Sequence, residues 1–163
     1  MERTLVLLKP DAVSRGLVGE ITQRFERVGL KIAGMKMVQP DEDIATKQYH
    51  DLGERKGADV LRVTVEMLVS GPVVAIVFEG IEAVELVRKM AGSTEPKAAA
   101  PGTIRGDYSH ISFKHADVKK IGVKNLIHAS GSVEDAEKEI PIWFEEEELI
   151  QHTPSYAKHT LGE

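Results

Sequence analysis

One histidine, His128, stands where its side chain could carry out chemistry. Two apolar residues precede it, and Ser130 follows two positions later. A neutral imidazole is a competent nucleophile near neutral pH, because its unperturbed pKa is about 6.5. Glu139, further along the chain, supplies a carboxylate that could orient the ring. A lone histidine beside apolar residues is more often a hydrogen-bonded structural residue, so a catalytic role needs support from other segments.

Basic and hydroxyl side chains elsewhere in the chain could bind an anion. Lys9 ends the first apolar run, while Arg88, Thr94 and Arg105 lie at the end of an expected helix and in the segment after it. Arginine suits phosphate oxygens because its donors are planar and bidentate. The alternatives are helix capping for Arg88, a loop salt bridge for Arg105 and simple solvation for Lys9. Taken with an imidazole and a carboxylate, these cations favour chemistry on phosphate groups.

Apolar runs and helical periodicity predict the elements that must position these residues. Strands are expected over residues 4–8, 30–38, 72–78 and 125–128. Helices are expected over residues 17–28, 42–52, 59–69 and 81–91, and from residue 132 to a stop at Pro141. This order reduces to βαββαβ with added helices. It predicts an α+β, ferredoxin-like fold, an antiparallel sheet with helices on one face.

The segment between residues 92 and 124 shows no periodicity. It predicts a loop of about thirty residues after the fourth major helix, a length that is usually functional or disordered inside a compact domain. The acidic run at residues 145–148 favours a solvated helix start. No internal repeat is evident, and 163 residues suit one domain spanning residues 1–163.

Composition limits the class of protein. The hydrophobic content of 42% and charged content of 29% are ordinary for a globular chain, and the net charge of −5 argues against a specific nucleic-acid partner. The absence of cysteine excludes disulfides, thiolate chemistry and cysteine-bound zinc. No apolar run is long enough for a signal peptide or a membrane span. We therefore expect a cytoplasmic protein that does not act at a membrane.

Several segments, in order, resemble the nucleoside diphosphate kinase family. The matching residues are 2–6 (ERTLV), 9–13 (KPDAV), 15–21 (RGLVGEI), 70–75 (SGPVVA), 88–94 (RKMAGST), 101–108 (PGTIRGDY), 125–130 (NLIHAS) and 137–144 (EKEIPIWF). So many segments in the right order form a specific signal. The resemblance raises His128 from a structural histidine to the expected nucleophile.

The resemblance implies transfer of the γ-phosphoryl group from a nucleoside triphosphate to a nucleoside diphosphate through a phosphohistidine, with ping-pong kinetics. It implies that Ser130 and Glu139 support His128. It assigns phosphate binding to Lys9, Arg88, Thr94 and Arg105, phosphate and lysine positioning to Tyr49, and sugar binding to Asn125. Mg²⁺ is expected to arrive on the nucleotide phosphates rather than in a protein cage. A homo-oligomer, either a tetramer or a hexamer, is also implied.

The chain departs from the family pattern at four places. Gly131 stands where the family usually has an acidic residue. Residues 55–61 lack the aromatic pair, one ring of which stacks on the base, and hold a few extra residues. The segment 109–124 is longer than usual and adds His110 and His115, for which a solvated loop is a better explanation than a metal site. The tail after Leu149 does not follow the usual ending.

Two other functions stay open on sequence alone. The first is a ferredoxin-like nucleotide-sensing module without turnover, which would need the phosphate-binding cations but no nucleophile. The second is a phosphohistidine transferase with a different acceptor, which the altered base-binding region leaves possible.

Overall fold

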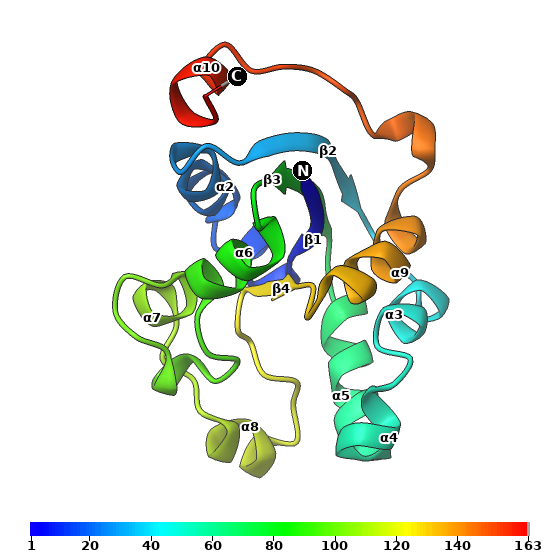
Figure 1. The fold of residues 1–163 in the computed structure, drawn as a ribbon. Coiled ribbons are helices and arrows are strands. Elements are labelled where there is room, and N and C mark those ends of the chain that lie inside the picture. The colour runs from blue at the N-terminus through cyan, green and yellow to red at the C-terminus, as the bar shows by residue number, and fades with distance from the viewer. Residues whose placement is uncertain (163) are drawn as a thin grey trace.

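A four-stranded antiparallel sheet forms the centre of the computed structural model, which describes residues 1–162 (Figure 1). The strand order is β2-β3-β1-β4. Their bounds are Glu2–Leu8 for β1, Lys31–Val38 for β2, Val73–Gly80 for β3 and Ile127–Ala129 for β4. All four predicted strands are present. The last begins at Ile127 rather than at residue 125, and β1 and β3 are longer than their apolar runs.

Helices cover both faces of the sheet, not the single face expected from the sequence. On one face α2 (Val18–Arg27) and α6 (Ala83–Ala91) bury Phe25 and Val87 against alternate residues of the strands. On the other face α3 (Glu42–Gln48), α5 (Ala58–Val69) and α9 (Val133–Trp143) bury Leu68 and Trp143 (Figure 1). The added helices therefore supply a second core, which explains why every residue of β3 is buried.

Two helices end at residues other than the predicted ones. The helix expected over residues 42–52 ends at Gln48, and a separate helix, α4 (Leu52–Lys56), follows it. Gly57, at a φ of +98°, separates α4 from α5, a conformation that glycine adopts at little cost. Pro141 does not end α9, which continues to Trp143. Proline removes one backbone hydrogen bond there, and the burial of the indole on the sheet offsets that loss.

The segment after α6 is not the single loop that the missing periodicity suggested. It contains a 3₁₀ turn, η1 (Pro96–Ala98), and two short helices, α7 (Ile104–Tyr108) and α8 (Phe113–Lys119). The side chains of Thr103 and Ser112 cap α7 and α8 by accepting backbone N–H groups. These helices are too short to show an apolar repeat, so only their capping residues could have indicated them in the sequence.

A short helix, α1 (Pro10–Ser14), comes after β1. The two ends of the chain lie away from α7 and α8 (Figure 1). The acidic run forms an exposed 3₁₀ turn, η2 (Glu146–Glu148), and the tail then passes β2, where the Ile150 N–H donates to the Ala33 carbonyl at 2.8 Å. A last short helix, α10 (Ala157–Thr160), follows (Figure 1). No helix in residues 1–162 combines the length and the apolar character needed to cross a bilayer.

Candidate active site

The short strand β4 places His128 at the centre of the site. In the sheet, His128 lies opposite Leu7 of β1. Just before β4, Leu126 takes a φ of +71° and is tied on both sides: its N–H donates to the Asp11 carboxylate at 3.0 Å, and its carbonyl accepts from the Lys9 N–H at 2.8 Å. A left-handed conformation is strained for a leucine and persists only where surrounding contacts impose it. These contacts bring the end of β1 beside β4.

A carboxylate contacts the imidazole, and a hydroxyl contacts that carboxylate. Glu139 Oε2 lies 2.9 Å from His128 Nε2, and the Ser130 hydroxyl donates to the same oxygen at 2.7 Å. The Ser130 oxygen also accepts the Leu5 N–H, so the hydroxyl is anchored to β1. An ionised Glu139 favours the tautomer with the ring proton on Nε2, in which the lone pair lies on Nδ1. Within residues 1–162, no protein group hydrogen-bonds Nδ1.

One partner of His128 was missed by the sequence analysis. The side-chain nitrogen of Gln48 lies 3.1 Å from His128 Nε2, and the Gln48 oxygen accepts the Trp143 indole N–H at 2.6 Å. Gln48 is 4% exposed. The sequence did indicate that Gln48 could be buried. It follows Ile44 by four positions and Ala45 by three, which places it on the apolar face of an expected helix.

Two buried cations lie beside the histidine strand. Lys9 Nζ donates to the Asn125 side-chain oxygen at 2.7 Å, and Asn125 donates in turn to the Thr94 carbonyl at 2.9 Å. The Arg105 guanidinium donates to three backbone carbonyls, those of Gly92, Asn125 and Ile127. Within residues 1–162 Arg105 forms no loop salt bridge, and its planar guanidinium keeps two further N–H groups for an anion.

Burial changes the acid–base properties of these groups. Desolvation, assisted by repulsion from Arg105, lowers the pKa of Lys9 to about 8. Desolvation also lowers the pKa of Arg105 to about 10, with Tyr49 opposing and Arg88 adding to the shift, so the guanidinium stays charged at neutral pH. Burial raises the pKa of Tyr49, whose hydroxyl has no hydrogen-bond partner within residues 1–162. The Tyr49 ring lies edge-on to the imidazole, with centroids 5.9 Å apart. Lys9 and Arg105 repel each other, and an anion bound next to both would relieve that repulsion.

The remaining predicted residues lie at the surface. Arg88, in the last turn of α6, is exposed, and its side chain forms no ion pair or hydrogen bond within residues 1–162. Thr94 is also exposed. The space beside Gly131 is taken by the Asp135 carboxylate, which would lie 2.6 Å from a Cβ at that glycine, while an Arg88 nitrogen would lie 3.8 Å from it. An acidic group is therefore present beside Gly131 although this residue has no side chain.

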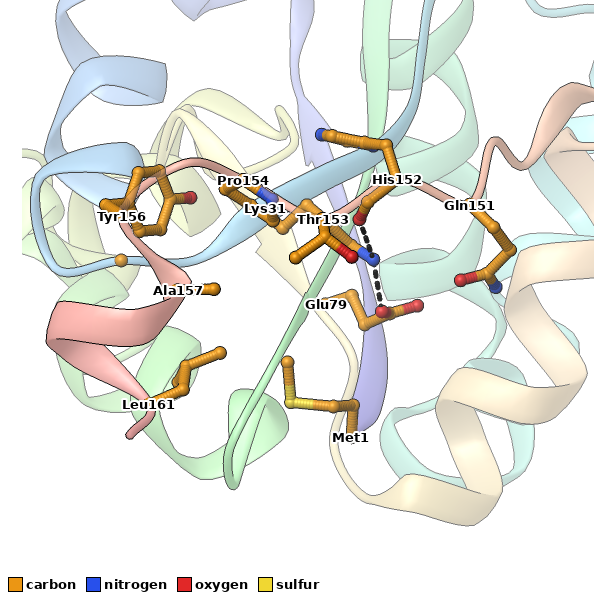
Figure 2. Close-up of a pocket in the computed structure, with 11 residues that line it drawn as sticks. Met1, Lys31, Glu79, Gln151, His152, Thr153, Pro154, Tyr156, Ala157 and Leu161 are labelled. Carbon is orange, nitrogen blue, oxygen red and sulfur yellow. Dashed lines mark hydrogen bonds and ion pairs between the residues drawn. The ribbon is translucent and has the colours of Figure 1, made fainter. Parts of the chain in front are cut away.

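A separate hollow of about 330 Å³ lies under the C-terminal tail and is lined by none of these residues (Figure 2). The Lys31 ammonium is its buried cation. It already contacts Glu79 at 2.5 Å and donates to the His152 carbonyl at 3.1 Å, as the dashed lines of Figure 2 show. Because Glu79 neutralises this lysine, the hollow attracts a phosphate less than Lys9 and Arg105 do, which form no ion pair within residues 1–162.

No group of three or more histidine or acidic side chains in residues 1–162 is arranged to hold a metal ion. His110 and His115, the two histidines of the longer segment, lie on different sides of the Ser112 cap, and His115 is exposed. The site around His128 is therefore cationic, with a single carboxylate committed to the imidazole. A histidine supported by a carboxylate and surrounded by cations is typical of an enzyme that transfers phosphoryl groups.

The chain belongs to the nucleoside diphosphate kinase family. The family model for nucleoside diphosphate kinase matches residues 2–149. The chain is 46% identical to the nucleoside diphosphate kinase of Borreliella burgdorferi over 154 residues, 93% of this chain and 92% of that protein. It is 51% identical to that of Pyrococcus furiosus over 93% of this chain and 88% of that protein.

Solved structures agree with this assignment. The Borrelia burgdorferi enzyme, solved as a transition-state mimic with vanadate and ADP, has a TM-score of 0.95 at 44% identity and covers 97% of this chain and 95% of its own. The Halobacterium salinarum enzyme, solved with CDP, has a TM-score of 0.83 at 38% identity over 98% of this chain and 97% of its own. The predicted family, fold class and enzyme class are thereby confirmed.

The buried lysine leads to a prediction about pH. In the free enzyme, kcat/KM for a nucleotide should fall as the pH rises through about 8, because Lys9 loses the charge that attracts phosphate. Its folded pKa lies below the unfolded value of 10.5, so the folded protein carries the cost of a buried charge below pH 8. Between these two values the unfolded chain binds more protons, and the free energy of unfolding should rise with pH.

Lys9→Met is the variant that checks this expectation, measured by pH–rate profiles and by urea unfolding between pH 7 and 10.5. The alkaline limb near pH 8 and the corresponding rise in stability should both disappear. Lys97→Met, at an exposed lysine of η1, is the matched control and should keep both. An unchanged alkaline limb in Lys9→Met would assign that limb to another group.

Proposed function

We propose that His128 carries the phosphoryl group between nucleotides. Nδ1 attacks the γ-phosphorus of a nucleoside triphosphate, the N–P bond forms, and the bond from phosphorus to the β,γ-bridging oxygen breaks to release the diphosphate. A second diphosphate then takes the phosphoryl group by the reverse step. The observation that supports this proposal is the Glu139 carboxylate, 2.9 Å from Nε2, which favours a proton there and so favours the tautomer with a lone pair on Nδ1.

The other site residues act through charge and alignment. Apart from the nucleophile, no protein group needs to form a covalent bond during phosphoryl transfer. Positioning and charge stabilisation therefore account for most of the rate enhancement. We assign phosphate binding to Lys9, Arg105, Arg88 and Thr94, and a hydrogen bond to phosphate from the Tyr49 hydroxyl, which has no partner within residues 1–162. Asn125 would reach the sugar with the second hydrogen of its amide, while its other contacts hold Lys9 and the Thr94 carbonyl.

Nucleoside di- and triphosphates are the proposed substrates. The similar Borrelia burgdorferi and Halobacterium salinarum enzymes were solved with ADP and with CDP, respectively. These two bases differ in size and in hydrogen-bonding groups, which favours acceptance of several nucleotides. Nothing in the described site singles out one base.

Mg²⁺ is the proposed metal, carried by the nucleotide. The donor set fits this mode of binding, because a hydrated Mg²⁺ needs only one or two protein oxygens when phosphates supply the rest. The Asp135 carboxylate beside Gly131 would contact the hydrated ion. When bound, the ion neutralises charge on the β- and γ-phosphates. The protein residues bind the remaining phosphate oxygens and align His128.

Two half-reactions test this function and both alternatives. The protein is incubated with [γ-³²P]ATP and Mg²⁺, freed of nucleotide, and then mixed with unlabelled GDP, CDP or UDP. Label should appear on the protein and move to each diphosphate. Failure to label would favour a nucleotide-sensing module, whereas label that no diphosphate removes would favour a transferase with another acceptor.

The missing base-stacking aromatic leads to a second prediction. Without that ring, diphosphates should bind more weakly than is usual for the family, because base–aromatic stacking contributes about 1–3 kcal/mol per base. Val60 on α5, 40% exposed, can accept a ring, whereas Gly57 at a φ of +98° would be strained by one. Val60→Phe should therefore lower the KM about five-fold or more and leave kcat unchanged.

One control variant tests whether any added ring lowers the KM, and two aromatic residues of the chain are candidates for the stacking ring. Val28→Phe, at an exposed site after α2, should change neither constant. Tyr108 is engaged elsewhere, since its hydroxyl donates to Glu20 and Arg24 lies over its ring, so Phe113 on α8 is the better natural candidate. A sharp rise in KM for Phe113→Ala, with no effect of Val60→Phe or Ala58→Phe, would show that α8 already supplies the stacking ring.

We further propose that the whole chain, residues 1–163, is one domain that forms a cytoplasmic homo-oligomer, a tetramer or a hexamer. The tail bonds to Ala33 and Lys31 of β2, which supports one folded unit. Strand β2 is an edge of the sheet and exposes Met35 and Met37. Exposed apolar residues on an edge strand favour pairing with another subunit.

A further inference from the structure

Gln48 is a buried polar side chain with one partner that fixes its orientation. The Trp143 indole N–H can only donate, so the Gln48 group 2.6 Å away must be the carbonyl oxygen. The amide NH₂ group is then the one that lies 3.1 Å from His128 Nε2. A flipped amide would face the indole donor with a second donor, which is unfavourable in a buried site. The orientation of this amide is therefore set by α9, not by α3 alone.

The same ring nitrogen consequently has two neighbours with opposite requirements. Glu139 accepts and favours a proton on Nε2. The Gln48 NH₂ group donates and favours a bare Nε2. Both side chains lie within hydrogen-bond distance, and His128 is 16% exposed at its side chain, so water cannot substitute freely for either.

We propose that Gln48, oriented by Trp143, is a positioning residue that limits how strongly His128 retains the proton on Nε2. Attack by Nδ1 places positive charge on the ring while Nε2 keeps its proton. Glu139 stabilises that charge, and the partial positive charge of the Gln48 NH₂ group opposes it. The Gln48 amide therefore limits the stability of the phosphorylated ring, so that the phosphoryl group can still leave. This inference rests on His128 being the phosphorylated residue.

The ionisable groups around the ring are Glu139 on α9 and Tyr49, which directly follows α3. Beyond them, Arg105 interacts electrostatically with Tyr49 and repels the Lys9 ammonium. None of these residues is altered by a substitution at position 48. A change in the pH dependence of His128 after such a substitution would therefore come from the amide.

Two variants change the group that faces Nε2. Gln48→Glu keeps the shape and accepts hydrogen bonds from both Trp143 and Nε2–H. Trp143→Phe leaves Gln48 in place but removes the donor that fixes its amide, so that the oxygen can turn to Nε2. For both, the equilibrium of the first half-reaction should move toward phosphoenzyme by about tenfold or more, because an acceptor for the charged ring replaces a donor that opposes its charge. The acid limb of kcat/KM should move to higher pH, with little change in KM.

The control is Gln39→Glu, at an exposed glutamine that donates to the Val69 carbonyl, and it should change neither the equilibrium nor the acid limb. The unmodified protein gives an independent measure through ¹⁵N NMR of its histidines. The Nε2 signal of His128 should lie between those of protonated and bare nitrogen, because both tautomers are populated. A fully protonated Nε2 in the neutral ring, or unchanged half-reaction equilibria in folded Gln48→Glu and Trp143→Phe, would overturn the inference. Loss of labelling in the unmodified protein would instead contradict the proposed function.

Discussion

His128→Ala is expected to abolish turnover and phosphoenzyme formation while the protein stays folded. Removing a covalent nucleophile typically costs on the order of 10⁴–10⁶-fold in kcat. The fold should persist because the Ser130 hydroxyl still donates to Glu139, which leaves that carboxylate paired. The measurements are transfer of label from [γ-³²P]ATP to the protein and thermal unfolding.

The chemistry of the label identifies the residue. A phosphoramidate on histidine is labile to acid and stable to alkali, unlike a phosphoserine. Ser130 is a poor acceptor because it is fully buried and its oxygen is engaged by Leu5 and Glu139. His115→Ala, at an exposed histidine of α8, is the control and should label normally. Label that survives acid, or that persists in His128→Ala, would exclude His128 as the acceptor.

Arg105→Lys and Arg88→Lys should both slow phosphorylation, and only the first should lower stability. Loss of a donor that stabilises transition-state charge costs about 2.7–4 kcal/mol, or roughly 10²–10³-fold in rate. Lysine does not reproduce the planar fork of arginine. At position 105 it would also leave some of the three backbone carbonyls without donors, and a buried unpaired acceptor costs about 1–3 kcal/mol. Arg88 is exposed and has no such structural contacts within residues 1–162.

Single-turnover phosphorylation and urea unfolding separate the two effects. Arg62→Lys on α5, an exposed arginine paired with Glu66, is the control and should change neither quantity appreciably. If folded Arg105→Lys phosphorylates at a near-native rate, Arg105 supports only the backbone around β4, and the phosphate site lies elsewhere.

The sequence itself determined the strands, the fold class and the importance of the segment that contains His128. Apolar runs such as residues 4–8 predict buried strands whatever surrounds them, because burial of apolar side chains drives their packing. The residues around His128, together with seven other segments, were enough to indicate the family. Local patterns were less informative for α7 and α8, since helices of one or two turns rest on caps and on contacts with the rest of the protein.

The tertiary structure decided which side chains meet. Gln48 and Trp143 come from different helices, and only the packing of α3 and α9 on one face of the sheet places the amide against His128 Nε2. Arg105 resembled a loop cation in the sequence, yet the approach of α7 to β4 buries it among carbonyls. Such contacts depend on helix packing and strand register, which the residues near each side chain in sequence do not specify.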